Sequence, residues 1–141
     1  MTLWPQPSRA EFDQFYRKSK AQGLAVSKDL LKALCTVESG LRPNVIVNDS
    51  NGHKSIGLCQ IQLRTARFMG YTGSEERLLR PHVNMYFAAK YLLYQFERYG
   101  QDWDKALGAY NQGFWSLKRP NKKYVDKVSK IYENLTKGET K

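Results

Sequence analysis

The feature that most constrains the fold of this chain is a long helical pattern of apolar residues between His82 and Tyr99. Its members recur at intervals of three and four residues, which is the spacing of one face of an α-helix. Gly100 follows, and glycine commonly comes directly after the last turn of a helix. The pattern therefore predicts the longest helix of a mainly α-helical protein. Its apolar members are Met85, Ala88, Ala89, Leu92, Leu93 and Phe96.

Shorter helices are predicted on both sides of this pattern. Ser8 and Glu11 have the spacing of a capping box, which predicts a helix over about 8–22. Ser27 is a suitable cap for a second helix, which ends at Glu38. Further helices are predicted over about 63–69, from about 74, over 103–110 and over 121–135, with fraying from Lys137 onward. In the last helix we predict that the inward residues are Val125, Val128, Ile131, Tyr132 and Leu135.

The segment after the second helix has a different composition. It is rich in Asn, Gly and Ser around two short β-branched runs, 45–47 and 54–58. We predict that these runs pair as a hairpin with 48–52 as its turn. The sum is a single domain over residues 1–141, mainly α with one small β element, and with a cleft between two lobes. Its N-terminal helix is predicted at about 8–22, and its functional motifs at about 27–135.

The chain carries a net charge of +10, from 23 Lys and Arg against 13 Asp and Glu. This excess predicts an anionic partner, which could be nucleic acid, a membrane surface or an acidic polymer. No apolar run approaches the roughly 18 residues that span a bilayer, so stable membrane insertion is not expected. The first residues lack the pattern of a secretory signal peptide, so we expect synthesis in a host cytoplasm without one.

The two cysteines, Cys35 and Cys59, lie in apolar contexts. We predict two buried, reduced thiols, because a chain without an export signal stays where disulfides are rare. A disulfide would require the fold to bring the two cysteines together. With His53 and His82 they do not form a metal-ligand spacing, so neither a metal site nor a cofactor is predicted.

Glu38 occupies an unusual place for an acid. It ends an apolar helix, where its carboxylate meets the negative end of the helix dipole. Partial burial among Leu34, Val37 and Leu41 would raise its pKa. Both effects are unfavourable for stability, but a raised pKa is what a general acid needs. Glu38 is therefore a candidate catalytic acid.

Two more polar clusters interrupt apolar patterns further along the chain. Gln60 lies among apolar neighbours in "GLCQI", and Tyr110 and Asn111 end the helix that begins with Trp103. Each has an ordinary structural explanation, since Gln60 could satisfy backbone groups and Asn111 could cap the helix. Three such clusters in this order, with Glu38-Ser39 as the first, favour one composite functional site.

These clusters resemble the successive motifs of the soluble lytic transglycosylase family, whose fold is similar to that of goose-type lysozyme. The resemblance covers about residues 30–131 and rests on "ESGLRPNV", "GLCQI", "NMYFAAKYL" and "AYNQG". It implies a lysozyme-like α+β fold. It also implies cleavage of peptidoglycan strands between N-acetylmuramic acid and N-acetylglucosamine, with formation of a 1,6-anhydro ring on the muramic acid.

The resemblance implies roles for individual residues. Glu38 is implied as the single catalytic acid and base, and Ser39 as a residue that orients its carboxylate or the sugar. The sequence departs from the family pattern at Cys59, where methionine is usual, and at Gln62-Leu63, where Met-Pro is frequent. The second departure predicts that the wall of a sugar-binding subsite differs from that of other family members. The residues implied to bind substrate are Ser39, Gln60, Tyr91, Tyr110, Asn111 and Tyr124.

One carboxylate suffices for this reaction because no water has to be activated. Glu38 would protonate the glycosidic oxygen and then deprotonate the C6 hydroxyl. Most glycosidases use two carboxylates. Asp49 in the hairpin turn is the candidate for a second, and a position facing Glu38 would favour a hydrolytic, lysozyme-like outcome instead.

Other classes of protein remain as alternatives at this point. A basic nucleic-acid-binding module would also explain the charge and the many tyrosines, although the basic residues are dispersed. A wall-binding protein on an inactive lysozyme scaffold is a third alternative, against which the intact Glu38, Gln60 and Asn111 speak. A short, basic lytic domain is typical of a bacteriophage endolysin or virion lysin. We therefore expect a monomer, encoded by a phage, that acts on the bacterial cell wall from the periplasmic side.

Overall fold

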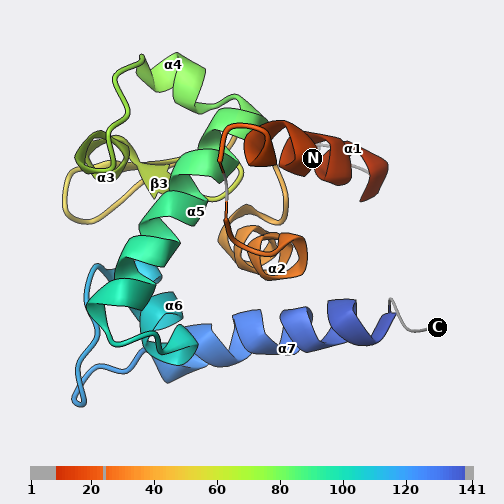
Figure 1. Ribbon diagram of the computed structural model, residues 1–141. Helices are drawn as coiled ribbons and strands as arrows, with labels where there is room; N and C mark the ends of the chain where they lie inside the picture. Colours follow the sequence, from red (N-terminus) through yellow and green to blue (C-terminus); the bar gives the residue numbers. More distant parts are fainter. Residues whose placement is uncertain (1–8, 24, 139–141) are drawn as a thin grey trace, which may run out of the picture.

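The computed structural model describes residues 9–23 and 25–138, in which helices dominate (Figure 1). Each predicted helix is present within a few residues of its expected bounds. Ser8, the predicted first cap, lies outside the described residues. The elements are α1 (Arg9–Lys20), α2 (Lys28–Ser39), β1 (Ile46–Asn48), β2 (Lys54–Ile56), β3 (Ile61–Gln62), α3 (Leu63–Phe68), α4 (Glu75–Leu78), α5 (Pro81–Arg98), α6 (Trp103–Gln112) and α7 (Lys122–Gly138).

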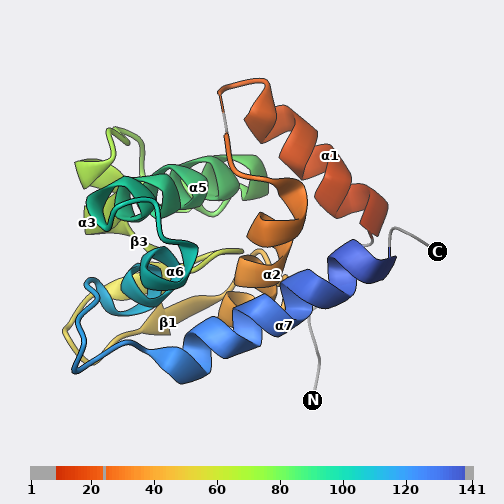
Figure 2. The ribbon, with the colours of Figure 1, turned by 60° about the horizontal axis from the view of Figure 1, so that its bottom comes forward.

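The long helix α5 is the element around which the others assemble. It contacts α1, α3, α4, α6 and β3. The C-terminal helix α7 packs along α2 and also meets α6, as Figure 2 shows. Local signals set the helix ends: the Ser27 hydroxyl accepts from the Leu30 N–H at the start of α2, and Asp102 accepts from the Lys105 N–H at the start of α6.

Two apolar clusters make up the core. The larger one joins α1, α2, α5, α6 and α7, and the smaller one joins the sheet, α3, α4 and the first half of α5. Tyr91 on α5 packs against both clusters. The two clusters correspond to the two predicted lobes. The largest fully buried side chains of the first are Phe12, Val26, Leu31, Leu34, Leu58, Met85, Leu92 and Val128, and those of the second are Ile56 and Leu78.

The β element is a three-stranded antiparallel sheet in the order β1-β2-β3. The predicted hairpin is present, with Val47 opposite Ser55. The third strand was not predicted: Ile61 and Gln62 pair with β2, and Gln62 lies opposite Ser55. Asp49 directly follows β1 in the turn of the hairpin, and its N–H donates to the His53 carbonyl over 2.8 Å.

The prediction of two reduced thiols is wrong in this structure. Cys35 and Cys59 form a disulfide, with their Cα atoms 4.3 Å apart. Both side chains are fully buried, as predicted, but the fold brings α2 and the loop after β2 into contact. The disulfide closes a loop of 24 residues that includes the whole hairpin.

The C-terminal helix also differs from its prediction. α7 continues to Gly138, where fraying was expected from Lys137. Val125 and Val128 are buried as predicted, and Ile131 and Leu135 pack against the larger cluster, but Tyr132 is 36% exposed. Within the described part of the chain, no helix has the length and apolar character needed to cross a membrane.

Candidate active site

The carboxylate of Glu38 is held in the last turn of α2 by two polar partners. The Tyr124 hydroxyl, on α7, donates to Glu38 Oε2 over 2.5 Å. The side-chain amide of Asn111, at the end of α6, also hydrogen-bonds to the carboxylate. Gly40 ends the helix in the left-handed conformation, with φ of 68°. Three helices therefore meet at this one acid.

Burial raises the pKa of Glu38 from 4.5 to about 7. Desolvation is the largest cause, because it penalises the charged form, and the negative charge of Asp49 adds a smaller contribution in the same direction. The hydrogen bonds from Tyr124 and Asn111 oppose this increase, because they stabilise the carboxylate. Glu38 is therefore half-protonated near neutral pH, which suits a group that must both donate and accept a proton.

The two tyrosines beside Glu38 stay protonated. Burial, with the neighbouring carboxylate as the next cause, raises the pKa of both Tyr110 and Tyr124 well above 10. Tyr110 uses its hydroxyl to donate to the Cys59 carbonyl over 2.7 Å. The two residues are thus permanent donors, and neither competes with Glu38 for a proton near neutral pH.

Gln60 projects from the loop between β2 and β3 in a left-handed conformation, with φ of 54°. Its Nε2 donates to the carbonyls of Val45, over 3.0 Å, and Gly57, over 2.9 Å. Both amide protons are therefore used within the protein. What remains for a ligand is the side-chain carbonyl oxygen, which can only accept hydrogen bonds.

A buried asparagine on α5 holds this loop in place. Asn84 accepts from the Cys59 N–H over 2.8 Å and donates to the carbonyls of Ile56 and Leu78. Gly57 has φ of 78°, and a Cβ there would lie 2.5 Å from the Asn84 amide nitrogen, so no larger residue fits. The loop that carries Gln60 is consequently fixed to α5 and, through the disulfide, to α2.

Asn111 is oriented by a residue that sequence reasoning missed. The Asn121 side chain donates through Nδ2 to Asn111 Oδ1 over 3.0 Å and to the Gly108 carbonyl over 3.2 Å. Because the Asn111 oxygen is occupied, its NH₂ group is the part that faces Glu38. Gly108 permits this approach, since a Cβ on it would lie 2.9 Å from the Pro120 carbonyl.

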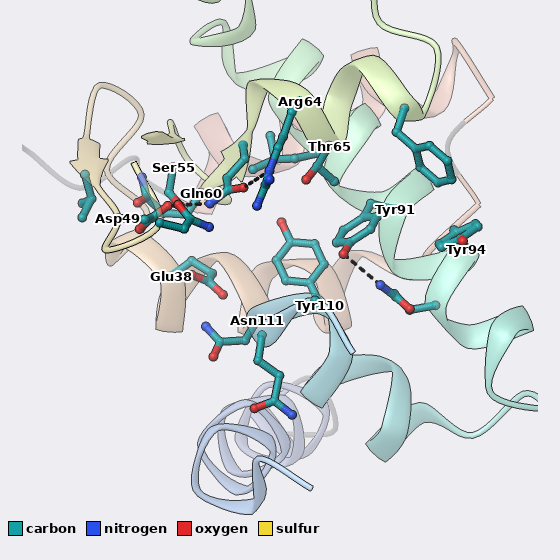
Figure 3. Close-up of a pocket in the computed structure, with 18 of the residues that line it drawn as sticks. Glu38, Asp49, Ser55, Gln60, Arg64, Thr65, Tyr91, Tyr94, Tyr110 and Asn111 are labelled. Atoms are coloured by element: carbon teal, nitrogen blue, oxygen red, sulfur yellow. Dashed lines mark hydrogen bonds between the residues drawn. The ribbon is translucent and has the colours of Figure 1, made fainter. Parts of the chain in front are cut away.

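Glu38 faces a cleft of about 790 Å³ between the two lobes (Figure 3). Gln60, Tyr110 and Asn111 line the same cleft, as predicted from their order in the sequence. Asp49 also lines it, so this turn residue does face the site of Glu38. Other lining residues come from α3 and α5 and include Arg64, Thr65, Phe68, Tyr94 and Arg98.

Tyr91 lines the cleft, but its ring contacts Tyr110 and not the Glu38 carboxylate. The two rings lie 5.5 Å apart between centroids, and the Tyr91 hydroxyl accepts from Gln95 Nε2 over 2.8 Å. Figure 3 shows Tyr91 beside Tyr110, further along the wall of the cleft from Glu38. Tyr91 and Tyr94 stack with centroids 6.2 Å apart, so they extend an aromatic surface along the cleft.

Two residues that were predicted to bind substrate are placed elsewhere. Ser39 is 2% exposed, and its hydroxyl donates to the Leu58 carbonyl over 2.6 Å and accepts from the Arg42 N–H. Tyr124 is buried behind Glu38 and does not line the cleft. Both side chains hydrogen-bond to protein groups, and neither lines the cleft. The spacing of their motifs cannot reveal which way they point.

Comparisons with known proteins agree with this arrangement. The family described as the transglycosylase SLT domain matches residues 15–133. Protein IpgF of Shigella flexneri is 35% identical over 112 residues, which cover 76% of this chain and 72% of that protein. Invasion protein IagB of Salmonella typhimurium is 33% identical over 116 residues, which cover 78% and 70%.

A solved structure has the same fold. The 70 kDa soluble lytic transglycosylase of Escherichia coli aligns with a TM-score of 0.57 at 24% identity. The alignment covers 84% of this chain but only 19% of that much longer one. A second structure of that enzyme, in complex with bulgecin A, aligns equally well.

Proposed function

This chain belongs to the transglycosylase SLT domain family, the family of peptidoglycan lytic transglycosylases, and we propose that it cleaves the β-1,4 bond between N-acetylmuramic acid and N-acetylglucosamine. The single observation that carries the proposal is the buried Glu38, whose pKa is raised to about 7 and whose carboxylate faces a cleft of about 790 Å³. The product we propose is a 1,6-anhydro-muramic acid end.

In the first step the protonated Glu38 donates its proton to the glycosidic oxygen. The bond between that oxygen and C1 of the muramic acid breaks, and the N-acetylglucosamine leaves with a free 4-hydroxyl. Positive charge develops at C1, which the acetamido group of the same sugar can stabilise. The pKa of about 7 supports this step, since a sizeable fraction of Glu38 carries the proton near neutral pH.

In the second step the Glu38 carboxylate takes the proton of the C6 hydroxyl. The C6 oxygen attacks C1 and closes the 1,6-anhydro ring, which returns Glu38 to its protonated form. No water is consumed. Tyr124 and Asn111 support this step, because their hydrogen bonds stabilise the carboxylate that forms between the two proton transfers.

The glycan would be held by the polar and aromatic groups of the cleft wall. Asn111 and the Gln60 carbonyl are polar groups of the cleft wall that can hydrogen-bond to acetamido and hydroxyl groups of the sugar. Tyr110, Tyr91 and Tyr94 present aromatic surface, on which sugar rings pack well. Ser39 and Tyr124 act by positioning Glu38.

Mass spectrometry of muropeptides released from purified murein tests the proposal. We expect anhydro-muropeptides from the wild type and none from Glu38→Gln, which keeps the shape of the side chain without its proton. Asp126→Asn on the exposed face of α7 makes the same acid-to-amide change as a matched control and should leave turnover unchanged. Full activity in Glu38→Gln would overturn the proposal.

Hydrolysis, as in a goose-type lysozyme, is the second candidate function. The observation that favours it is Asp49, which lines the cleft and contributes to the raised pKa of Glu38. Water would then attack C1, with Asp49 as the base, and leave a reducing end. Digestion in ¹⁸O-labelled water separates the two reactions: label at C1 that disappears in Asp49→Asn supports hydrolysis, and anhydro ends without label support transglycosylation.

In this proposal the positive net charge explains how the protein stays at its substrate. A net charge of +10 would hold the protein electrostatically at a cell wall that carries peptide carboxylates. We retain the predictions of a phage-encoded lysin made in a host cytoplasm, of a monomer, and of no nucleic-acid partner, although the relatives above come from bacteria. Sedimentation and a duplex-binding titration over a range of salt test the last two.

A further inference from the structure

The departure from the family pattern at Gln62 creates a polar chain along one wall of the cleft. Gln62 Nε2 donates to Asp49 Oδ2 over 2.8 Å. Its other amide atom, Oε1, accepts from Arg64 Nε over 3.0 Å. One amide therefore connects a carboxylate of the hairpin turn to a guanidinium of α3 (Figure 3).

Asp49, at one end of this row of hydrogen bonds, is held in place by two donors. The Ser55 hydroxyl, on β2, also donates to Asp49 Oδ2, over 2.5 Å. Because Gln62 and Ser55 lie opposite each other in the sheet, their side chains reach the same oxygen. The register of β3 against β2 thus fixes the direction in which the Gln62 amide points, and its carbonyl oxygen is left for Arg64.

The hydrogen bond to Gln62 uses only Nε of the Arg64 guanidinium. The two terminal nitrogens of the guanidinium have no carboxylate partner among the described residues. Arg64 is exposed and lines the cleft on the wall opposite Asn111. A guanidinium oriented through Nε, with its two terminal groups facing a ligand cleft, is suited to bidentate recognition of a carboxylate.

We propose that Arg64 is a specificity-determining residue that binds a carboxylate of the glycan substrate, and that Gln62 and Asp49 position it. This inference rests on the proposed function. The carboxylate is either the free lactyl group of a muramic acid that has lost its stem peptide or a carboxylate of the stem peptide itself. Neutral polymers of N-acetylglucosamine carry neither group, so Arg64 favours bacterial wall over chitin-like strands.

Three murein substrates test this assignment. The first keeps its stem peptides, the second has lost them to an amidase and so carries a free lactyl carboxylate, and the third has that carboxylate blocked as a methylamide. We expect Arg64→Gln to raise KM about tenfold where the recognised carboxylate is present, as removal of one charge-assisted contact predicts, with kcat little changed. An effect on the first substrate alone identifies a carboxylate of the stem peptide. An effect on the second alone identifies the lactyl carboxylate, which is an amide in the first, and an effect on both shows that Arg64 accepts either carboxylate.

Two further variants separate binding from structure. Gln62→Met keeps the side-chain volume and removes both hydrogen bonds, so it should raise KM on the same substrates by a smaller factor. Arg67→Gln removes the same charge from the next turn of α3, outside the catalytic cleft, and should change KM less than twofold. Melting temperatures of all variants establish that the fold persists.

Equal losses on all three substrates, no loss on any of them, or an Arg67→Gln effect as large as that of Arg64→Gln would each overturn the inference. Its failure is distinguishable from that of the proposed function. If turnover still depends on Glu38 while Arg64→Gln behaves like the control, only the recognition of a carboxylate is wrong. If Glu38→Gln remains active, the proposed function itself fails.

Discussion

Replacing Glu38 by glutamine should stabilise the folded protein at pH 8 while abolishing its activity. Folding raises the pKa of this carboxyl from 4.5 to about 7. Between these two pH values the unfolded chain ionises Glu38 and the folded protein keeps it protonated. The stability contributed by the bound proton is therefore fully present below about pH 4.5 and is lost as the pH rises through about 7.

The size of the effect follows from the pKa difference. A difference of about 2.5 pH units, at 1.36 kcal/mol per unit, makes ionised Glu38 cost about 3 kcal/mol of folding free energy at pH 8. Glutamine has no charge to desolvate and can still accept from Tyr124. In a chain of this size, about 3 kcal/mol corresponds to an increase in Tm of roughly 10 °C.

Urea unfolding of wild type and Glu38→Gln at pH 4 and pH 8 measures the effect. We expect nearly equal unfolding free energies at pH 4 and the full difference at pH 8. Asp126→Asn, at an exposed carboxyl on α7, is the matched control and should leave the pH dependence unchanged. The reasoning is refuted if the difference between wild type and Glu38→Gln is the same at both pH values.

Three further predictions concern the groups around the catalytic acid. Tyr124→Phe removes a hydrogen bond that lowers the pKa of Glu38, so the alkaline limb of the pH–activity profile should move up by about one unit; an unchanged limb would contradict this. Reduction of the disulfide between Cys35 and Cys59 should lower the unfolding free energy by about 3 kcal/mol, and thiol titration before and after reduction checks that the bond was present. Asn84→Ala leaves three buried backbone groups without their partner and should cost about 3 kcal/mol or more in urea unfolding, whereas a loss below 1 kcal/mol would show that water replaces the amide.

Much of the fold was predictable because its signals are local. The repeat of apolar residues in α5 and the caps at Ser27 and Asp102 depend only on neighbours within one or two turns. The third strand was missed because Ile61-Gln62 is too short to show an alternating pattern. The end of α7 was misplaced because residues 136–138 carry no apolar repeat from which a helix end could be predicted.

The candidate site was predictable in its members and less so in their roles. The ordered motifs identified Glu38, Gln60, Tyr110 and Asn111, all of which line one cleft. No local pattern could assign Asn121, because an asparagine before a helix has an ordinary capping explanation. The polar Asn84 interrupts the apolar pattern of the long helix, and this was the one sequence signal that a buried side chain holds the loop that carries Gln60.

The sequence by itself determined which segments are helical, most of their ends to within a few residues, and which acid is the candidate for catalysis. Only the tertiary structure decided what surrounds that acid. Tyr124 lies 86 residues from Glu38, and Cys59 lies 24 residues from Cys35, yet each pair is in direct contact. Spacing along a chain specifies local geometry, whereas the pKa of Glu38 depends on burial and on partners that folding alone brings together.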